Sequence, residues 1–362
     1  MTPQSKIKLI ARLWLHISQR RRGQFGVLLV LMILTSFAEI LSISAVLPFL
    51  AILTDPGRVF SHSSSQSIIQ VMGITEPKQL ILPLTIVFSL AVLTAGTMRI
   101  ILLWTSTRLS YATGADLSIS IYRRTLYQPY AIHVARNSSE IIDGISLKTN
   151  NAIYLINMIL NLISSSFMLV AILVALLSID PVIALVTFGG FGLIYFMIIQ
   201  FTRNSLLLNS QTVARESTRV IKSLQEGLGG IRDILIDGSQ ETYCQIYSHA
   251  DQQLRRAQGI NTFISSSPRN GLEALGILLI AILAYTLSQE ADGINQAIPA
   301  LGALALGAQR LLPVLQQAYS SYSTIQGGRV SLQDALDLLD QPLPDYAGVP
   351  VASSFTFRQQ IH

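Results

Sequence analysis

Charged residues and cysteines are both scarce in this sequence. Asp, Glu, Lys and Arg make up only 12% of its 362 residues, whereas they make up about 25% of a typical soluble domain. The single cysteine, Cys244, excludes an internal disulfide. The five histidines lie far apart and lack the spacing of metal ligands; they are His16, His62, His133, His249 and His362. These features argue against a soluble domain, a disulfide scaffold and a metal site.

Nucleotide-binding and catalytic motifs are also missing. The string G-x-x-x-x-G-K-[ST], whose backbone amides cradle phosphates in ATPases, does not occur. The pairs Gly229-Gly230 and Gly327-Gly328 are not followed by Lys-Ser or Lys-Thr, and their context favours breaks between helices. No two carboxylates lie together on a predicted outer face, where such a pair would suggest acid–base catalysis. We therefore predict that this chain contains no catalytic residues, no ATP-binding residues and no cofactor of its own.

What the sequence does contain is six long apolar stretches that are almost free of charge. Each is long enough to cross a bilayer, because a hydrocarbon core about 30 Å thick needs about 20 helical residues. The stretches lie at 25–53, 80–104, 152–179, 181–201, 271–288 and 294–320. The sequence therefore predicts an all-α integral membrane protein with six spans.

Positive charge is distributed unevenly between these spans. Lys and Arg gather before the first span and in the two long gaps, 105–151 and 202–270, whereas the gap 54–79 holds only Arg58 and Lys78. This is the positive-inside pattern, and it predicts that both termini and both long gaps are cytoplasmic. We expect a multi-pass protein of a bacterial-type inner (plasma) membrane. The pattern also explains the net charge of +5 without nucleic acid as a partner.

Residues 1–24 contain a candidate amphipathic helix. Basic residues in 5–19 lie on a different part of the helical wheel from five apolar residues, Ile7, Ile10, Leu13, Trp14 and Ile17. We expect this helix to lie among lipids in the inner membrane interface, with a solvated tail as the alternative. The apolar run that follows Arg22 is too long for the core of a cleavable signal peptide.

The first long gap is typical of a helical hairpin that extends beyond the membrane. Residues 105–127 contain no proline and continue the helix of the second span for about 35 Å. Gln128-Pro129 ends this helix, because proline lacks an N–H donor and restricts the residue before it. A short segment, 129–134, follows, and we expect Ser138 or Ser139 to cap the returning helix.

The second long gap repeats this pattern. Residues 202–226 continue the fourth span, Gly227, Gly229 and Gly230 interrupt the helix, and 231–238 form a short segment. The returning helix, 239–267, has an apolar stripe that is expected to pack the pair together; its members are Tyr243, Ile246, Ala250, Leu254, Ala257, Ile260 and Ile264. Each gap is therefore predicted to be a long hairpin with a short transverse segment at its tip.

This layout resembles the transmembrane domain of ABC exporters. Residues 225–234, with Gln240-Glu241, are similar to the segment around the second coupling helix of that family. Residues 331–342 resemble the helix that joins the sixth span to the nucleotide-binding domain, and 355–362 resemble the first strand of that domain. The resemblance implies an interfacial helix at 1–24, a six-helix transmembrane domain at 25–320, a linker helix at 321–344 and a stub of the nucleotide-binding domain at 345–362.

Short motifs also resemble one branch of the family, the lipid-linked oligosaccharide flippases. These motifs are Glu39 followed by Pro48-Phe49-Leu50, Tyr122-Arg123-Arg124, and Gln128-Pro129-Tyr130. The resemblance implies a lipid-linked saccharide or another amphiphile as cargo, and a second copy of the transmembrane domain as partner. It also implies an ATPase domain that binds ATP and Mg²⁺ and that is either truncated from this sequence or encoded separately.

The hairpin tips are the expected contacts with that ATPase domain. The resemblance assigns this coupling role to two short segments, whose residues are Pro129, Tyr130, Ala131, Ile132, His133, Ile231, Arg232, Asp233, Ile234 and Asp237.

Four charged residues within the spans are candidates for a substrate cavity, since charge in hydrocarbon is costly and usually faces a cavity or a partner. Glu39 either faces a cavity, pairs with an arginine or packs as a protonated acid. Arg310 is a candidate for the phosphate of an anionic cargo, with a structural pair or snorkelling as alternatives. Arg99 and Arg269 lie near inner span ends, where snorkelling is expected. Three polar residues of the third span are expected to join helices, namely Asn157, Asn161 and Ser164.

The sequence thus favours one membrane half of an ATP-driven exporter or flippase that moves an amphiphile out of the inner leaflet. The alternative is an integral membrane enzyme of lipid or glycan synthesis, which would need a cluster of acids or histidines at one interface. A secondary transporter would show inverted repeats and short inner loops, and neither is seen in this sequence.

Overall fold

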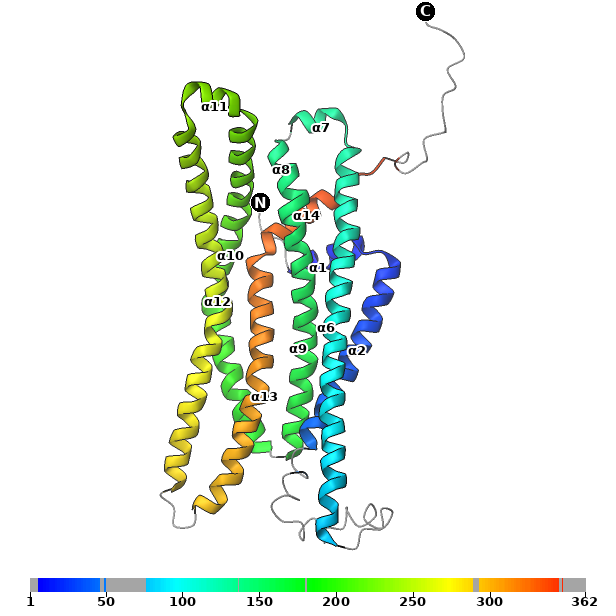
Figure 1. Ribbon diagram of the computed structural model, residues 1–362, viewed down its shortest axis with the longest axis vertical. Coiled ribbons are helices and arrows are strands. Elements are labelled where there is room, and N and C mark those ends of the chain that lie inside the picture. Colours follow the sequence, from blue (N-terminus) through cyan, green and yellow to red (C-terminus); the bar gives the residue numbers. More distant parts are fainter. Residues whose placement is uncertain are drawn as a thin grey trace, which may run out of the picture.

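The computed structural model describes residues 6–45, 49, 76–135, 137–179, 181–288, 293–344 and 347, and these contain helices and no strand. Six long helices run along the molecule: α2 (Gln19–Ser44), α6 (Ile81–Leu126), α9 (Thr149–Ile179), α10 (Pro181–Gly229), α12 (Gln240–Ser288) and α13 (Gly293–Gly327) (Figure 1). The short elements are α1 (Lys6–His16), η1 (Pro77–Leu80), α7 (Tyr130–Ala135), α8 (Ser138–Asp143), the π turn η2 (Gly144–Lys148), α11 (Ile231–Asp237) and α14 (Arg329–Leu339).

Four of the described helices are long and apolar enough to cross a membrane. They are Gln19–Ser42, Ile81–Leu126, Ser138–Ala175 and Phe188–Gly229. The predicted spans 271–288 and 294–320 lie on α12 and α13, which are helical there, although many of their side chains lie outside the described part. The helical path is therefore consistent with six spans, and the gap 54–79 falls mostly outside the described residues.

Two of the long helix pairs protrude as hairpins. Helix α6 has 46 residues and α10 and α12 have 49 each, so they measure about 70 Å, more than twice the hydrocarbon core. The first hairpin joins α6 to α8, η2 and α9 through α7, and the second joins α10 to α12 through α11. Both tips lie at the same end of the molecule (Figure 1). The predicted all-helical architecture with two hairpins is confirmed.

The helix breaks follow the sequence signals with two differences. The cap of α8 is Asn137, not Ser138 or Ser139. Asn137 has extended backbone angles, so its side chain can accept from the Ser139 amide at 3.1 Å, whereas both serines are already helical. In the second hairpin, α10 continues through Gly227 to Gly229, because a glycine inside a helix costs only about 1 kcal/mol. Gly238 ends α11 in the left-handed conformation at φ 65°.

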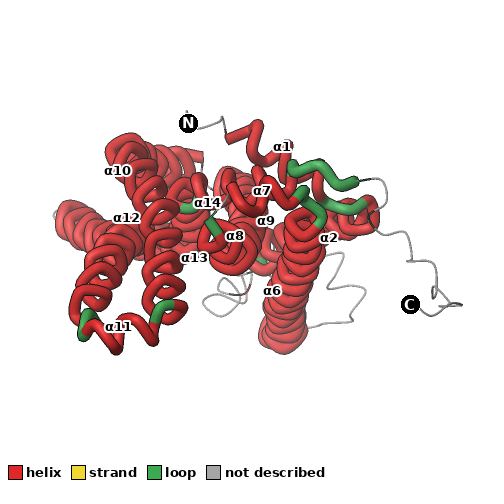
Figure 2. The backbone as a smooth tube through the Cα atoms, turned by 90° about the horizontal axis from the view of Figure 1, so that it is seen from above, coloured by secondary structure: helices red, strands yellow, loops and turns green. Residues whose placement is uncertain are grey.

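The two apolar clusters nearest the hairpin shafts lie in different parts of the molecule. The larger cluster packs α2, α6 and α9 against α1 and α14, through residues such as Leu13, Met32, Ile121, Leu155 and Leu336. A second cluster holds α10 against α12 through Val213, Val220, Ala250, Leu254 and Ala257. Figure 2 shows α10 to α12 on one side and α2 and α6 on the other, with α14 between them. A third cluster, around Ile172 and Leu311, joins α9, α10 and α13, so the two hairpins are also packed to each other further along the bundle.

The apolar side of α1 is divided as well. Leu9, Leu13 and Ile17 are buried in the larger cluster, whereas Ile10 and Trp14 are exposed. Part of the predicted membrane-facing stripe therefore packs against the protein. The exposed remainder still suits the interface, and contact with lipids stays a prediction.

Candidate functional site

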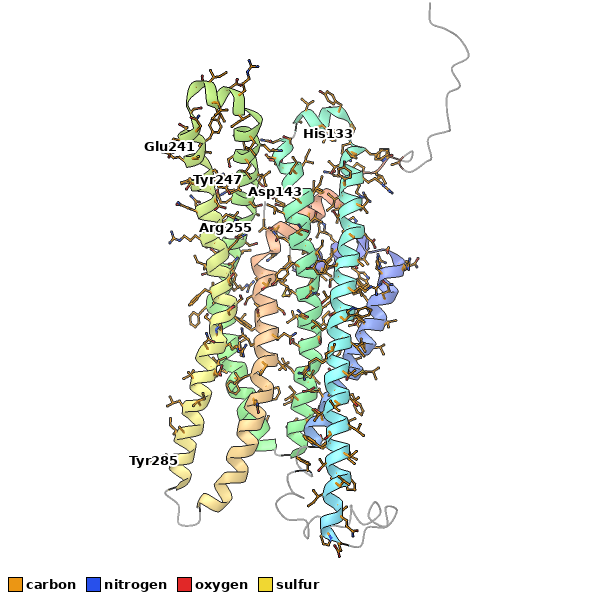
Figure 3. The ribbon with its side chains drawn as sticks, in the orientation of Figure 1. His133, Asp143, Glu241, Tyr247, Arg255 and Tyr285 are labelled. Atoms are coloured by element: carbon orange, nitrogen blue, oxygen red, sulfur yellow. The ribbon has the colours of Figure 1, made fainter. Side chains whose placement is uncertain are left out.

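The tips of the hairpins expose apolar side chains away from the apolar spans. Tyr130 on α7 is 81% exposed and Leu235 on α11 is 60% exposed, and no residue of α7 is buried. His133 also lies at the α7 tip (Figure 3). Contiguous exposed apolar patches mark interaction sites. One coupling candidate differs, because the Ile234 side chain is only 5% exposed and is not available at the surface of the tip.

Helix α14, which falls within the predicted linker 321–344, lies in the same half of the molecule as the tips and is held by ion pairs to α1. Arg12 contacts both Asp337, at 2.7 Å, and Asp340, and His16 Nε2 lies 2.6 Å from Asp340 Oδ1. Burial alone would raise the pKa of Asp340, but the hydrogen bonds with His16 and Arg12 outweigh it and hold that pKa below its ordinary value. The ionised carboxylate therefore adds to the apolar packing between α1 and α14.

The chain after α14 is bonded to the first hairpin. Gln128 Nε2 donates to the carbonyl oxygens of Pro342 and Arg124, each at 2.9 Å, and Arg124 donates to the carbonyl of Gln341. Gln128 immediately precedes Pro129, so the break that forms the tip also fixes the position of the chain that follows α14.

A cavity of about 390 Å³ lies among α2, α6, α9 and α13, far from the tips. Glu39 and Arg99 form an ion pair in its wall, with Arg99 Nη2 donating to Glu39 Oε2 at 2.7 Å. The Glu39 side chain is only 4% exposed, whereas that of Arg99 is 58% exposed. The remaining lining is mixed, with polar residues Thr35, Ser106, Asn161, Ser164, Ser165, Gln309 and Gln317 among leucines and methionines. Such an amphipathic wall suits a ligand with both polar and apolar parts.

One buried hydroxyl group in this wall has no hydrogen-bond partner among the described residues. Ser165 is buried, and its Oγ neither donates nor accepts within the described part of the protein. A buried polar group without a partner is costly, so a ligand or water that reached Ser165 would gain a hydrogen bond.

Residues 25–293 match the family described as the ABC transporter transmembrane region. The chain belongs to this family. Among solved structures it is similar to a bacterial Atm1-family ABC exporter with ATP bound, with a TM-score of 0.62 and 15% sequence identity. That similarity covers 89% of this chain and 54% of the exporter chain, so this chain spans about half of the exporter's length. At this identity the similarity shows the ABC exporter fold alone.

The structure brings together only part of the predicted set of cavity residues. Glu39 and Arg99 meet, so Arg99 pairs with an acid instead of snorkelling alone. Arg269 is exposed on α12 and is not among the residues that line this cavity, and the Arg310 side chain lies outside the described residues. Asn161, expected to join helices, instead donates to Asn157 of its own helix at 3.1 Å and faces the cavity.

Several lining residues were missed by sequence reasoning, notably Thr35, Ser165, Gln309 and Gln317. The available signal was a polar residue within an apolar span. That signal does not distinguish a cavity-lining residue from one whose hydroxyl bonds its own helix, as Thr35 does to the Leu31 carbonyl at 2.8 Å.

Proposed function

We propose that this chain is the membrane half of an ATP-driven ABC exporter and works as a pair of such halves with ATPase domains. The observation that carries the proposal is the pair of exposed apolar tips, α7 and α11, which lie at one end of the molecule. A channel has no evident need for two apolar tips at the ends of long helical hairpins. Such tips suit docking to a domain that moves. ATP and Mg²⁺ would be bound by that domain.

The mechanism is alternation between two states. ATP binding closes the two ATPase domains, and α7 and α11 pass this motion to their hairpins. The shaft of the second hairpin has an apolar cluster of its own, between α10 and α12, so in this proposal that hairpin moves as one unit. When the tips move together, access to the cavity among α2, α6, α9 and α13 changes. The cargo shifts the equilibrium between the two states because it binds one of them more tightly than the other.

The cargo that suits this cavity is an anionic amphiphile, and the motif resemblance favours a lipid-linked saccharide taken from the inner leaflet. Arg99 uses one N–H on Glu39, and a guanidinium has five, so it can also donate to a phosphate. Apolar residues of the same wall suit a lipid chain, and Asn161 and Ser165 suit sugar hydroxyls. Arg310 is a second candidate for the phosphate. In this proposal the tips and both termini are cytoplasmic, in a bacterial-type inner membrane.

Site-directed crosslinking tests the docking. In a Cys244→Ser background, a cysteine at Ala131 or Leu235 should crosslink to a co-expressed ATPase domain. The matched control is a cysteine at Leu185, which is exposed near the start of α10 at the opposite end of the molecule and should not react. Ile234 is unsuitable because it is buried. Absence of crosslinks from both tips in a folded protein would overturn the proposal.

Transport by an Arg310→Ala variant tests the cargo. If Arg310 binds the phosphate, this variant should fold normally and lose transport of a lipid-linked saccharide in vesicles with the ATPase domain restored. Unchanged transport would remove Arg310 from the proposed cargo site.

A further inference from the structure

The π turn η2 interrupts the helix of the first hairpin at 144–148. A π turn adds one residue to a helical turn and is often found at functional sites. It brings residues five positions apart onto one face, and Lys148 Nζ therefore lies 3.5 Å from Asp143 Oδ2. The Thr149 hydroxyl donates to the Gly144 carbonyl at 2.8 Å, which satisfies an acceptor within the turn.

Asp143 connects the first hairpin to the second. Its side chain is 0% exposed and accepts from the hydroxyls of Ser217 and Thr218 on α10, each at 2.7 Å. A buried carboxylate is tolerated only where charge and hydrogen bonds compensate for its lost hydration. Ser217, Thr218 and Lys148 provide that compensation, so the charge has a specific position between the hairpins. Figure 3 shows Asp143 at the level of α14.

Lys148 carries the connection on to the linker helix. Its Nζ donates to Asp334 Oδ2 at 2.7 Å, and its side chain is largely buried. The backbone of the π turn also touches α14 directly, because a Cβ at Gly144 would lie 2.4 Å from Leu338 Cδ1. The first turn of α14 is bonded to α10 as well, through the Val330 amide and the Ser210 hydroxyl at 3.1 Å.

We propose that Asp143, Lys148 and Asp334 form a three-way joint that positions the linker helix α14 against both hairpins. Motion of an ATPase domain then reaches the spans through α14, in addition to the two tips. This role rests on the proposed function. In this proposal these residues position α14, and none of them lines the cavity among α2, α6, α9 and α13.

In the joint, the acid Asp143 is buried and the base Lys148 is largely buried, whereas the buried Glu216 of α10 pairs with two arginines that are more than half exposed. The pair of Lys222 and Glu226 on α10 lies 3.7 Å apart with both side chains about half exposed. An exposed pair of this kind contributes little. Lys222 therefore provides a matched control for Lys148, with the same residue type, on a hairpin, next to an acid.

The test separates ATP hydrolysis from movement of the spans and needs no identified cargo. The full chain with a Cys244→Ser background and a cysteine at Ser164 in the cavity wall is reconstituted with its ATPase domain. Maleimide labelling at position 164 is then measured with and without ATP and Mg²⁺. In the parent protein, which keeps Asp143, Lys148 and Asp334, the labelling rate should change at least fivefold when ATP is added.

The variants Lys148→Met and Asp334→Asn should hydrolyse ATP within twofold of the parent, while the ATP-dependent change in labelling falls below twofold. Lys222→Met should behave as the parent. Lys148→Arg keeps the positive charge, so it should retain most of the ATP-dependent change in labelling that Lys148→Met loses. If the parent itself shows no ATP-dependent change, the proposed function fails and the joint fails with it. If the parent responds and both joint variants respond equally, the joint alone is overturned. Equal losses in Lys222→Met, or loss of hydrolysis in the joint variants, would also overturn it.

Discussion

The Glu39–Arg99 pair is the clearest case in which single residues decide the character of a site. Glu39 is almost fully buried at membrane depth, and its carboxylate is tolerated because Arg99 donates to it at 2.7 Å from 60 residues away in sequence. Arg99 is more exposed, so it can face the cavity while it holds Glu39. Removing Arg99 should therefore affect the stability of the protein differently from removing Glu39.

We expect Arg99→Met to destabilise the protein more than Glu39→Gln does, because it leaves a buried carboxylate without one of its donors. The double variant should recover part of the loss, with a coupling energy of about 0.5–3 kcal/mol. Thermal unfolding in detergent of the two single variants and the double variant provides the measurement. Strictly additive effects would show that the ion pair contributes nothing to stability.

At the scale of elements, close helix packing depends on one glycine between α6 and α9. A Cβ built on Gly114 would lie 2.1 Å from Cγ1 of Ile153, and its three nearest atoms all belong to that side chain. Isoleucine is branched at Cβ and has little freedom to turn away. The two helices therefore approach more closely at Gly114 than any other residue would allow.

Gly114→Ala should destabilise the protein by about 1–3 kcal/mol, as overpacking in a close-packed interior usually does. Adding Ile153→Ala should relieve the clash and restore part of the stability. Gly96→Ala on the same helix is the control, because nothing lies within 4 Å of its Cβ position. Helix propensity then predicts a neutral or slightly stabilising effect for that variant. Equal melting temperatures for the two alanine variants would contradict the packing argument.

The contact between α1 and α14 should depend on pH. Asp340 has a lowered pKa in the folded protein, so the carboxylate contributes stability above its unfolded pKa of about 3.9. That contribution to stability is lost as the pH falls through the pKa that Asp340 has in the folded protein. Asp340 is partly exposed, and exposed pairs contribute about 0.2–1 kcal/mol, so the effect should be small.

Melting temperatures from pH 7 down to pH 3 test this dependence. The parent should exceed Asp340→Asn at pH 7, and the difference should become smaller as the pH falls below the unfolded pKa of about 3.9. Asp251→Asn, which removes a contact with Arg255 within α12, is the control and should change little. A difference between parent and Asp340→Asn that persists unchanged at pH 3 would rule out the carboxylate as its source.

For the whole molecule, the sequence predicted the path of the chain better than the contacts between its helices. Apolar spans, the absence of proline from 105–127 and the break at Pro129 are local signals, and they led to the two hairpins. The meeting of Glu39 with Arg99, and of Asp143 with α10, depends on the rotation and register of helices that are distant in sequence. The π turn has no evident sequence signal, yet it decides which residues of the first hairpin face α14.

The exposed tips allow function and folding to be separated in the whole molecule. Tyr130→Asp or Leu235→Asp places a charge where the side chain is already mostly in solvent, so stability should change by no more than about 0.5 kcal/mol. Binding of an ATPase domain should nevertheless weaken at least tenfold, because the charge would have to be buried at an apolar contact. Ile246→Asp is the control, since Ile246 is half exposed on the shaft of α12 below the tip. Titration of the purified chain with an ATPase domain, the partner in the proposed function, measures the affinity, and melting curves measure the stability. Unchanged affinity in both tip variants would mean that the tips do not carry the ATPase contact.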